Sequence, residues 1–229
     1  MSNAKGLRSL RPVKISPSIL SANPLALGRQ VYEVKDAGAD LLHLDIMDGH
    51  FVPNLTFGPA VAKALGSIGL PLDIHLMISN PEWGIDAFCD YAEYITIHAE
   101  ATPHLHRFLR LIREKGCRSG VALNPSTPPQ VIEHVIDETD LVVIMTVNPG
   151  WGGQPFIPGM LRKIEQVRQI IDEAGLPVEI EVDGGITSDN SRCVIEKGAD
   201  ILVSGSYVFS SEHMAAAIGK LRGGTITTC

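Results

Sequence analysis

Two histidines and two aspartates interrupt segments of the sequence that are otherwise largely apolar. His43 and Asp45 lie in the run LHLDIM, His75 lies in LDIHLM, and Asp183 ends the run EIEVD. Side chains alternate between the two faces of a strand, so His43 and Asp45 share one face. Two imidazoles and two carboxylates suit a borderline divalent cation, with zinc favoured and iron, manganese or cobalt also accepted. Burying unpaired carboxylates by chance would be costly, so the pattern indicates a site.

The segments that carry these residues belong to a pattern that repeats along the chain. Short apolar or β-branched runs, interpreted as strands, lie at residues 13–20, 40–47, 71–77, 94–98, 118–123, 141–146, 178–183 and 201–205. Between them, apolar residues recur at spacings of three and four, which predicts helices that pack on a sheet. One such helical stretch carries Met160, Ile164, Val167, Ile171 and Ala174.

Strands that alternate with helices predict an α/β protein with a parallel sheet. Eight such units in about 220 residues predict a single (β/α)8 TIM barrel, assigned to residues 1–229 with residues 1–12 as an N-terminal tail. An open doubly wound sheet is the competing architecture, but the first strand is not followed by its usual G-x-G-x-x-G turn. The active site of a barrel lies at the carboxyl ends of its strands, where the two histidines and two aspartates are expected to converge.

Glycine clusters follow the last three predicted strands. The sequence PGWGG occupies residues 149–153, GG occupies residues 184–185, and Gly205 and Ser206 follow the eighth strand. Glycine lets backbone N–H groups approach an anion, and the loops after strands seven and eight often bind phosphate in these barrels. The clusters therefore predict a phosphorylated small molecule as the ligand.

Asp45 and Asp183 come from the second and seventh predicted strands, roughly across the lumen of an eight-stranded barrel. A substrate held between two carboxylates can lose a proton from one face and gain one on the other. A metal bound to a carbonyl and its neighbouring hydroxyl would stabilise an enediolate. The pair thus predicts inversion at a carbon beside a ketone. Core packing and a soft apolar lining of the site are both open interpretations of Met47, Met77 and Met145.

Two other polar residues in or near these strands are interpreted as structural. His98, with Glu100 nearby, is expected to be a satisfied histidine of the core. Asp73 is expected to start a strand or to pair with a lysine.

Six motifs along the chain, in this order, resemble those of the ribulose-phosphate 3-epimerase family. They are SPSILSA at residues 16–22, HLDIMDGHFVPN at 43–54, DIHLM at 73–77, VNPGWGGQ at 147–154, VDGGI at 182–186 and GSYVF at 205–209. The resemblance covers about residues 15–221. It implies a ribulose-phosphate-binding barrel that interconverts D-ribulose 5-phosphate and D-xylulose 5-phosphate by inversion at C3, through a metal-stabilised enediolate.

The resemblance also implies a role for each motif residue. One divalent metal per subunit would be held by His43, Asp45, His75 and Asp183, and the two acid/bases would be Asp45 and Asp183. Substrate contacts would come from Ser18, His75, Gly150, Trp151, Gly152, Gly153, Asp183, Gly184, Gly185, Gly205 and Ser206. The intermediate would be shielded by Met47, Met77 and Met145. Trp151 stands where the family usually has phenylalanine.

Three alternatives to a pentulose-phosphate epimerase stay open. An epimerase of a ketohexose 6-phosphate, such as D-allulose 6-phosphate, would use the same chemistry, and one extra carbon changes pocket contacts by only about 1–3 kcal/mol. A decarboxylase or aldolase with a D-x-K site would need lysine where Met47 stands. A non-enzymatic sugar-phosphate-binding barrel would be favoured by loss of a ligand or an acid/base, and the sequence retains all four.

Charge and composition narrow the partners and the compartment. The net charge is −7 and no basic stripe is present, which argues against nucleic acid as a partner. No apolar run is long enough for a membrane span, and the first residues lack the apolar segment of a secretory signal. The four cysteines form no C-x-x-C pair and are interpreted as reduced thiols of a cytoplasmic protein. The family resemblance implies a homo-oligomer, either a dimer or a hexamer.

Overall fold

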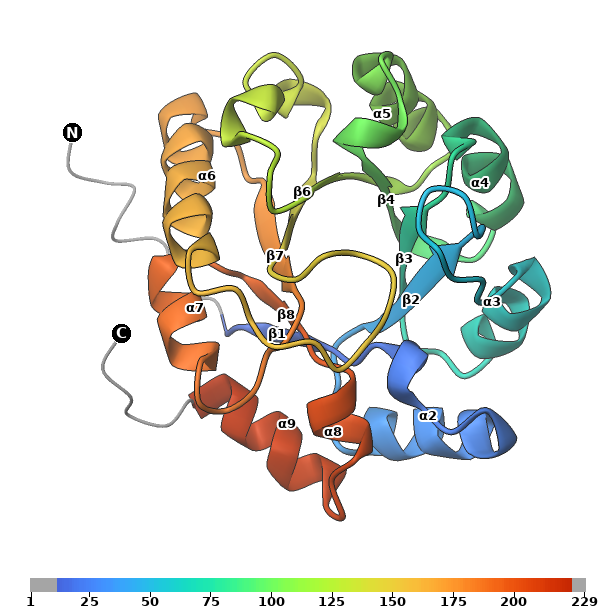
Figure 1. Ribbon diagram of the computed structural model, residues 1–229. Helices are drawn as coiled ribbons and strands as arrows, with labels where there is room; N and C mark the ends of the chain where they lie inside the picture. Colours follow the sequence, from blue (N-terminus) through green and yellow to red (C-terminus); the bar gives the residue numbers. More distant parts are fainter. Residues whose placement is uncertain (1–11, 224–229) are drawn as a thin grey trace.

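Eight parallel strands form the inner wall of a (β/α)8 barrel, and helices surround them (Figure 1). The computed structural model describes residues 12–223. The strands are β1 (Lys14–Ser16), β2 (Leu42–Met47), β3 (Leu72–Met77), β4 (Ala92–His98), β5 (Arg118–Leu123), β6 (Leu141–Met145), β7 (Glu179–Asp183) and β8 (Ile201–Val203). The α-helices are α2 (Leu27–Asp36), α3 (Pro59–Gly66), α4 (Pro81–Phe88), α5 (Leu105–Glu114), α6 (Met160–Ala174), α7 (Ser191–Lys197), α8 (Ser206–Phe209) and α9 (Met214–Gly223).

The strands pair in the order β1-β8-β7-β6-β5-β4-β3-β2. The ring closes between β1 and β2 through a short parallel bridge between Ser18 and His43. There the His43 N–H donates to the Pro17 carbonyl at 3.1 Å. The first strand is shorter than the sequence predicted because Ile19–Ser21 turns into a 3-10 helix capped by the Ser18 side chain. Closure therefore places Ser18 beside the second strand at the carboxyl end of the barrel.

The main hydrophobic core lies between the sheet and the helices. Leu42, Leu44 and Ile46, on the outer face of β2, belong to this core. Ile164 and Val167 are fully buried on α6, as the predicted stripe requires. The α6 helix ends at Gly175, whose φ of 67° is the left-handed conformation that glycine adopts without strain.

The connection between β5 and β6 differs from the helix–strand alternation that the sequence predicted. In this described segment the chain forms two 3-10 turns, Pro129–Ile132 and Ile136–Glu138, in place of an α-helix. Pro125, Pro128 and Pro129 explain the difference, because proline has no backbone N–H to donate to a helical hydrogen bond. The turns still bury Ile132 and Ile136 against the sheet.

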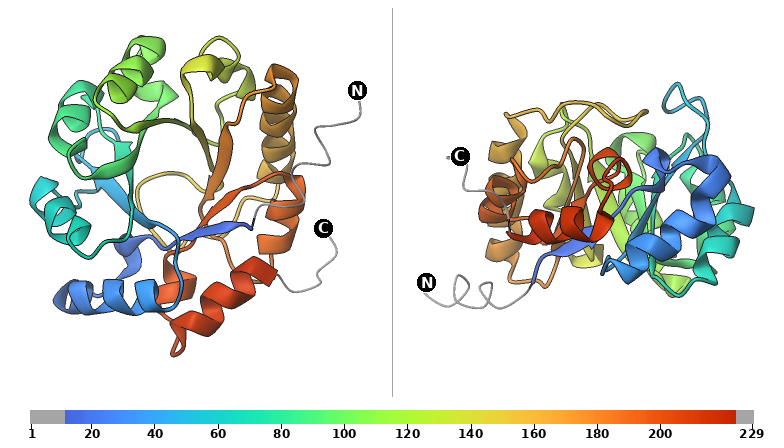
Figure 2. Two further views of the ribbon diagram at one scale, coloured as in Figure 1. Left: turned by 180° about the vertical axis from the view of Figure 1, so that it is seen from behind. Right: turned by 90° about the horizontal axis from the view of Figure 1, so that it is seen from below.

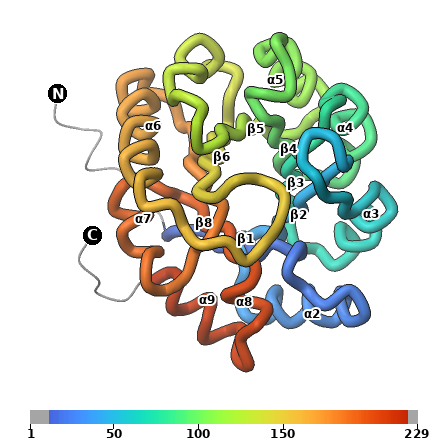
Figure 3. Tube along the Cα trace, in the orientation of Figure 1, coloured from blue at the N-terminus to red at the C-terminus, as the bar shows by residue number. Residues whose placement is uncertain are grey.

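Both long loops that flank the site lie at one end of the barrel. The loop after β2 and the loop between β6 and α6 project from the same end in the view along the sheet (Figure 2). The loop between β6 and α6, in yellow and gold, crosses in front of the barrel centre (Figure 3). Residues 146–159 form this loop, which therefore covers part of the opening.

Two further expectations concern the thiols and the membrane. Cys89 and Cys117 are free, whereas Cys193 is disulfide-bonded. The prediction that every thiol is reduced is therefore wrong at Cys193. Within residues 12–223, no helix combines the length and the apolar character that crossing a bilayer requires.

Candidate active site

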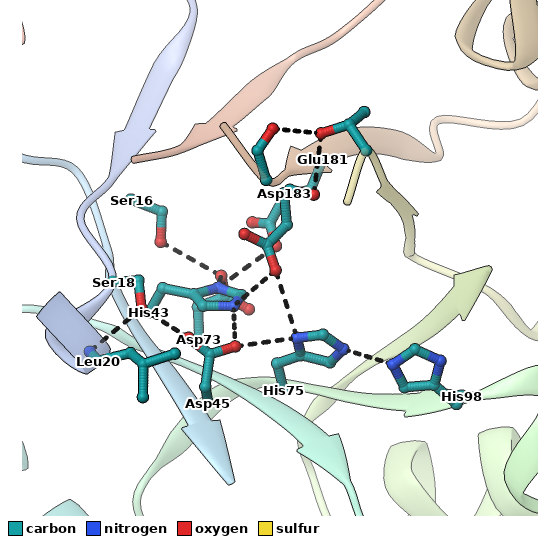
Figure 4. A network of polar contacts seen from close by, with 12 residues as sticks. Ser16, Ser18, Leu20, His43, Asp45, Asp73, His75, His98, Glu181 and Asp183 are labelled. Carbon is teal, nitrogen blue, oxygen red and sulfur yellow. Dashed lines mark hydrogen bonds and ion pairs between the residues drawn. The ribbon is translucent and has the colours of Figure 1, made fainter. Parts of the chain in front are cut away.

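The four predicted ligands come together at the carboxyl ends of three strands (Figure 4). Asp45 on β2 lies directly beside His75 on β3 in the parallel register. His43 lies two residues before Asp45 on the same inward face, and Asp183 is the last residue of β7. One ligand atom from each of the four residues lies within 4.8 Å of all the others.

The distances within the cluster fit a set of ligands around one small cation. Oδ1 of Asp45 lies 3.3 Å from Nε2 of His43 and 3.2 Å from Nδ1 of His75. Oδ2 of Asp183 lies 3.9 and 3.7 Å from the same two nitrogens. Nε2 of His43 is buried and has no hydrogen-bond partner among the described residues. A divalent ion would satisfy this nitrogen and would balance the two carboxylates.

The two aspartates have pKa values that shift in opposite directions. Burial disfavours ionisation of Asp45, but His43 and His75 outweigh it and hold the Asp45 pKa well below its ordinary value. Burial and the neighbouring charge of Asp45 raise the pKa of Asp183 to about 7. Two carboxyl groups whose pKa values are driven apart are suited to act as one base and one acid.

Hydrogen bonds outside the ligand set fix the orientation of His43 and Asp45. Nδ1 of His43 lies 2.7 Å from Oδ2 of Asp73, which also accepts from the Ser16 hydroxyl at 3.2 Å. The Ser18 hydroxyl donates to Oδ2 of Asp45 at 2.6 Å and leaves Oδ1 facing the histidines. The interpretation of Asp73 as a partner of lysine is wrong, because its side chain holds a site histidine. Asp73 also lies beside Glu181, whose pKa burial and the Asp73 charge raise well above the ordinary value.

A cavity of about 340 Å³ opens over the cluster. Its lining includes all the residues that the sequence assigned to substrate contacts except His75, which lies fully buried beneath. These are Ser18, Gly150, Trp151, Gly152, Gly153, Asp183, Gly184, Gly185, Gly205 and Ser206. The side chains of Met47, Met77 and Met145 also line it. Within the described chain, this lining includes no lysine or arginine, so an anion there would depend on neutral N–H and O–H donors or a cation.

The glycines of the cavity wall allow a close approach of neighbouring segments. Gly185 has a φ of +65°, and a Cβ there would lie 2.5 Å from the Phe156 backbone nitrogen. A Cβ on Gly205 would lie 2.7 Å from the Ser21 hydroxyl. Gly185 thus lies against the loop after β6, and Gly205 lies against the 3-10 turn that follows β1.

The sequence reasoning assigned no functional role to a second group of polar residues that contacts the cluster. Nε2 of His98 lies 2.9 Å from Nε2 of His75, and Nδ1 of His98 lies 3.0 Å from Oε2 of Glu100. Burial is the main reason that the pKa of His98 falls to about 4. The sequence shows that His98 and Glu100 are two residues apart. No pattern of alternation in it indicated that His98 on β4 would lie next to His75.

A (β/α)8 barrel with two aspartates and two histidines clustered at the carboxyl ends of its strands defines the class of the protein as a barrel enzyme. Comparisons with known proteins specify the group within that class. The sequence model described as the "Ribulose-phosphate 3 epimerase family" matches residues 14–209. The chain belongs to the ribulose-phosphate 3-epimerase family, whose members are isomerases.

Individual relatives are similar over most of their length. The chain is 51% identical to a ribulose-phosphate 3-epimerase of Bacillus subtilis over 92% of this chain and 99% of that protein. It is 48% identical to one of Synechocystis over 92% of this chain and 93% of that protein. A solved structure of a mutant tryptophan synthase alpha-subunit from Pyrococcus furiosus superposes with a TM-score of 0.67, covering 93% of this chain and 99% of that one. At 17% identity the last comparison concerns the barrel fold alone.

Proposed function

We propose that the protein interconverts D-ribulose 5-phosphate and D-xylulose 5-phosphate by inverting the configuration at C3. The observation that carries the proposal is the pair of carboxylates, Asp45 and Asp183, that β2 and β7 bring to one cavity. The names of the curated relatives support the pentulose as substrate over the ketohexose phosphate. Methionine at position 47 gives no support to a lysine-dependent decarboxylase or aldolase.

In the protein without a bound cation, the pKa values of the two carboxylates shift in opposite directions, which supports complementary roles for them. Ionised Asp45 is the base that takes the proton from C3 on one face of the substrate. Protonated Asp183 is the acid that returns a proton to C3 on the other face and inverts the centre. After one turnover Asp45 is protonated and Asp183 is ionised. These are the protonation states that the reverse reaction requires, in which the two residues exchange roles.

His43, Asp45, His75 and Asp183 would hold one divalent cation, for which zinc is our proposal. A bound cation would supply positive charge that stabilises the enediolate between the two proton transfers. The two imidazoles and two carboxylates, together with the unpartnered Nε2 of His43, support this assignment.

The cavity wall is proposed to bind the rest of the substrate. Gly184, Gly185, Gly205 and Ser206 would offer backbone N–H groups to the phosphate. The loop that carries Gly150, Trp151, Gly152 and Gly153 would cover the sugar. The side chains of Met47, Met77 and Met145 would exclude water from the intermediate. The Ser18 hydroxyl would orient Asp45 beside the substrate, and the buried His75 would lie beneath the substrate as a ligand of the cation.

The cellular context is also a proposal. The reaction would place the enzyme in carbohydrate metabolism, at a step of the pentose phosphate pathway. A homo-oligomeric state, dimer or hexamer, is proposed from the family resemblance, and a cytoplasmic location is proposed because Cys89 and Cys117 are free thiols.

Substitution of Asp183 by asparagine tests the two-base scheme. Loss of one acid/base should lower kcat in both directions by about 10²–10⁴-fold. Circular dichroism should remain that of the wild type, because the amide keeps the shape of the side chain. Asp189→Asn is the matched control, since Asp189 lies exposed in the loop that follows Asp183 and does not line the cavity. A folded Asp183→Asn enzyme that inverts C3 at the wild-type rate would refute the scheme.

A further inference from the structure

His98 and Glu100 form a chain of contacts that leads from the partly exposed carboxylate of Glu100, through the buried imidazole of His98, to a proposed metal ligand. His98 is fully buried, and its two ring nitrogens lie 2.9 Å from His75 and 3.0 Å from Glu100. The rings of His75 and His98 are nearly parallel, with an interplanar angle of 22°. Figure 4 shows His98 on the side of His75 that faces away from Asp45.

The hydrogen-bond partners of Glu100 set the direction of every proton along this chain. The Asn124 N–H donates to Oε1 of Glu100 at 3.0 Å, and the Thr127 hydroxyl donates to the same oxygen. Two donors stabilise the ionised carboxylate, which can only accept, so Nδ1 of His98 must carry a proton. In a neutral ring the other nitrogen, Nε2, then carries a lone pair.

Two nitrogens 2.9 Å apart share one proton. Because Nε2 of His98 is the acceptor, Nε2 of His75 is the donor. The lone pair of His75 is therefore on Nδ1, the nitrogen that faces Asp45 and Asp183 at 3.2 and 3.7 Å. This is the tautomer that a metal ligand requires at that position.

We propose that His98 and Glu100 are positioning residues that hold His75 in the tautomer and orientation for binding the cation through Nδ1. The inference rests on the proposed function, because it concerns the same cation. Neither His98 nor Glu100 lines the cavity or belongs to the ligand cluster. His98 contacts one member of the cluster, His75, and Glu100 acts through His98.

The chain of contacts continues from Glu100 into the outer layer of the barrel. Nζ of Lys163 on α6 donates to the carbonyls of Asn124 and Pro125 at 2.8 and 2.7 Å. These bonds hold the turn after β5, which supplies the two donors to Glu100. On its other side, His98 packs against the Phe51 ring, with the centroids 4.8 Å apart. The position of the imidazole is thus fixed by three separate segments.

His43 provides a contrast within the same site. Its Nδ1 contacts the carboxylate of Asp73 directly, so it does not depend on His98. A change at Glu100 should therefore act on His75 alone and should weaken the cation site without removing the other three ligands.

Glu100→Gln should reverse the donor and acceptor roles in the hydrogen bonds that join residue 100, His98 and His75, with little change in side-chain shape. An amide nitrogen facing His98 would donate where the carboxylate accepts, so His98 would move its proton to Nε2. Two N–H groups would then face each other between His98 and His75. We expect Zn²⁺ affinity, measured on the metal-stripped protein by competition with a chromophoric chelator, to fall by about 10–100-fold.

Thr96→Val is the matched control. Thr96 lies on β4, is fully buried, points inward two residues before His98, and its hydroxyl has no hydrogen-bond partner in the described chain. Replacing the hydroxyl by a methyl group should leave the Zn²⁺ affinity within about twofold of wild type. Equal affinities in Glu100→Gln, Thr96→Val and wild type, with all three proteins folded, would overturn the proposal.

A second measurement uses the wild-type protein alone and therefore does not depend on the folding of a variant. In the Zn²⁺-loaded wild-type protein, ¹⁵N NMR of the histidine rings should show His98 protonated at Nδ1 and unprotonated at Nε2. A proton on Nε2 of His98 would overturn the inference. Failure of the wild-type protein to bind Zn²⁺ would instead overturn the metal assignment of the proposed function, so the two failures are distinguishable.

Discussion

At the level of single residues, different neighbours shift the pKa values of Asp45 and Asp183 in opposite directions. Asp45 contacts two imidazoles and accepts from the Ser18 hydroxyl. Asp183 lies farther from both histidines and faces the negative charge of Asp45. The same residue type is thus suited to act as a base on one strand and as an acid on another, because its surroundings differ.

The raised pKa of Asp183 makes the stability of the metal-free protein depend on pH. The folded state binds this proton more tightly than the unfolded chain, since the pKa rises from 3.8 to about 7 on folding. The contribution is complete below pH 3.8 and is lost as the pH rises to about 7. Between pH 5 and 7 the free energy of unfolding of wild type should therefore fall by about 2–3 kcal/mol relative to Asp183→Asn.

Urea unfolding of both metal-free proteins at pH 5 and pH 7 measures this difference. All other titrating groups are present in both proteins, so the difference isolates Asp183. Parallel pH dependences would show that the carboxyl group is ionised throughout this range, and Asp183 would then not be the resting acid.

Residue types and alternation indicated the four ligands but not the residues that orient them. His43, Asp45, His75 and Asp183 are visible because each occupies an inward position near a strand end. Asp73 and His98 occupy inward positions too, but their partners depend on the stagger between neighbouring strands. That stagger is set by packing of the whole sheet, so sequence reasoning interpreted both residues as structural.

At the level of elements, the site depends on how the loops after β6 and β7 fit together. Gly185 follows β7, and its Cα lies against the backbone of Gln154 and Phe156. A methyl group there would lie 2.8 Å from the Gln154 carbonyl oxygen and 2.5 Å from the Phe156 nitrogen. Neither atom can move without displacing the loop that covers the cavity.

Comparison of Gly185→Ala with Gly153→Ala separates the energetic cost of a steric collision from the cost of backbone strain. Both glycines have positive φ, +65° and +74°, but a Cβ at Gly153 meets no atom within 4 Å. We expect Gly153→Ala to cost about 1–2 kcal/mol of unfolding free energy from strain alone. Gly185→Ala should cost about 2 kcal/mol more, because its Cβ collides with backbone atoms.

Chemical denaturation of the two variants and wild type provides the values. Similar losses for both variants would mean that the loop between β6 and α6 yields easily. The close approach of the two loops at Gly185 would then contribute little to the free energy of unfolding.

Element boundaries show where local patterns were sufficient. The stripe of Ile164, Val167 and Ile171 predicted α6, which ends at Gly175. The strand at residues 118–123 was predicted with the bounds observed. The first strand was predicted too long, because the side-chain cap that Ser18 provides for the following turn was not recognised.

At the level of the whole molecule, the protein carries the same sign of charge as the anionic ligand that the cavity is proposed to bind. The chain carries a net charge of −7. The cavity lining, within residues 12–223, contains no lysine or arginine. Attraction at long range therefore cannot come from basic side chains at the opening.

Ionic strength tests this distribution of charge. Salt screens the repulsion between an acidic protein and a phosphate ester, so kcat/KM of the metal-loaded enzyme should stay constant or rise modestly from about 10 to 300 mM NaCl. Steady-state kinetics at fixed pH measure the trend. A steep fall in kcat/KM with salt would indicate steering by basic groups and would contradict this account of the cavity.

The barrel itself was predictable from the repeated alternation of strands and helices, and eight strands in one parallel ring confirm it. Repetition is a property of the whole chain and survives local exceptions, such as the proline-rich connection between β5 and β6. Cavity shape was less predictable, because it depends on how the loops pack together.

Two carboxylates and a bound cation are proposed to invert C3 of a pentulose phosphate. The decisive experiment is proton NMR of D-ribulose 5-phosphate incubated with the enzyme in D₂O, with and without a chelator. We expect xylulose 5-phosphate with deuterium at C3, and suppression of the reaction when metal is removed. Neither inversion nor exchange in the metal-loaded protein would contradict the proposal, and full activity after removal of metal would contradict the role of the cation.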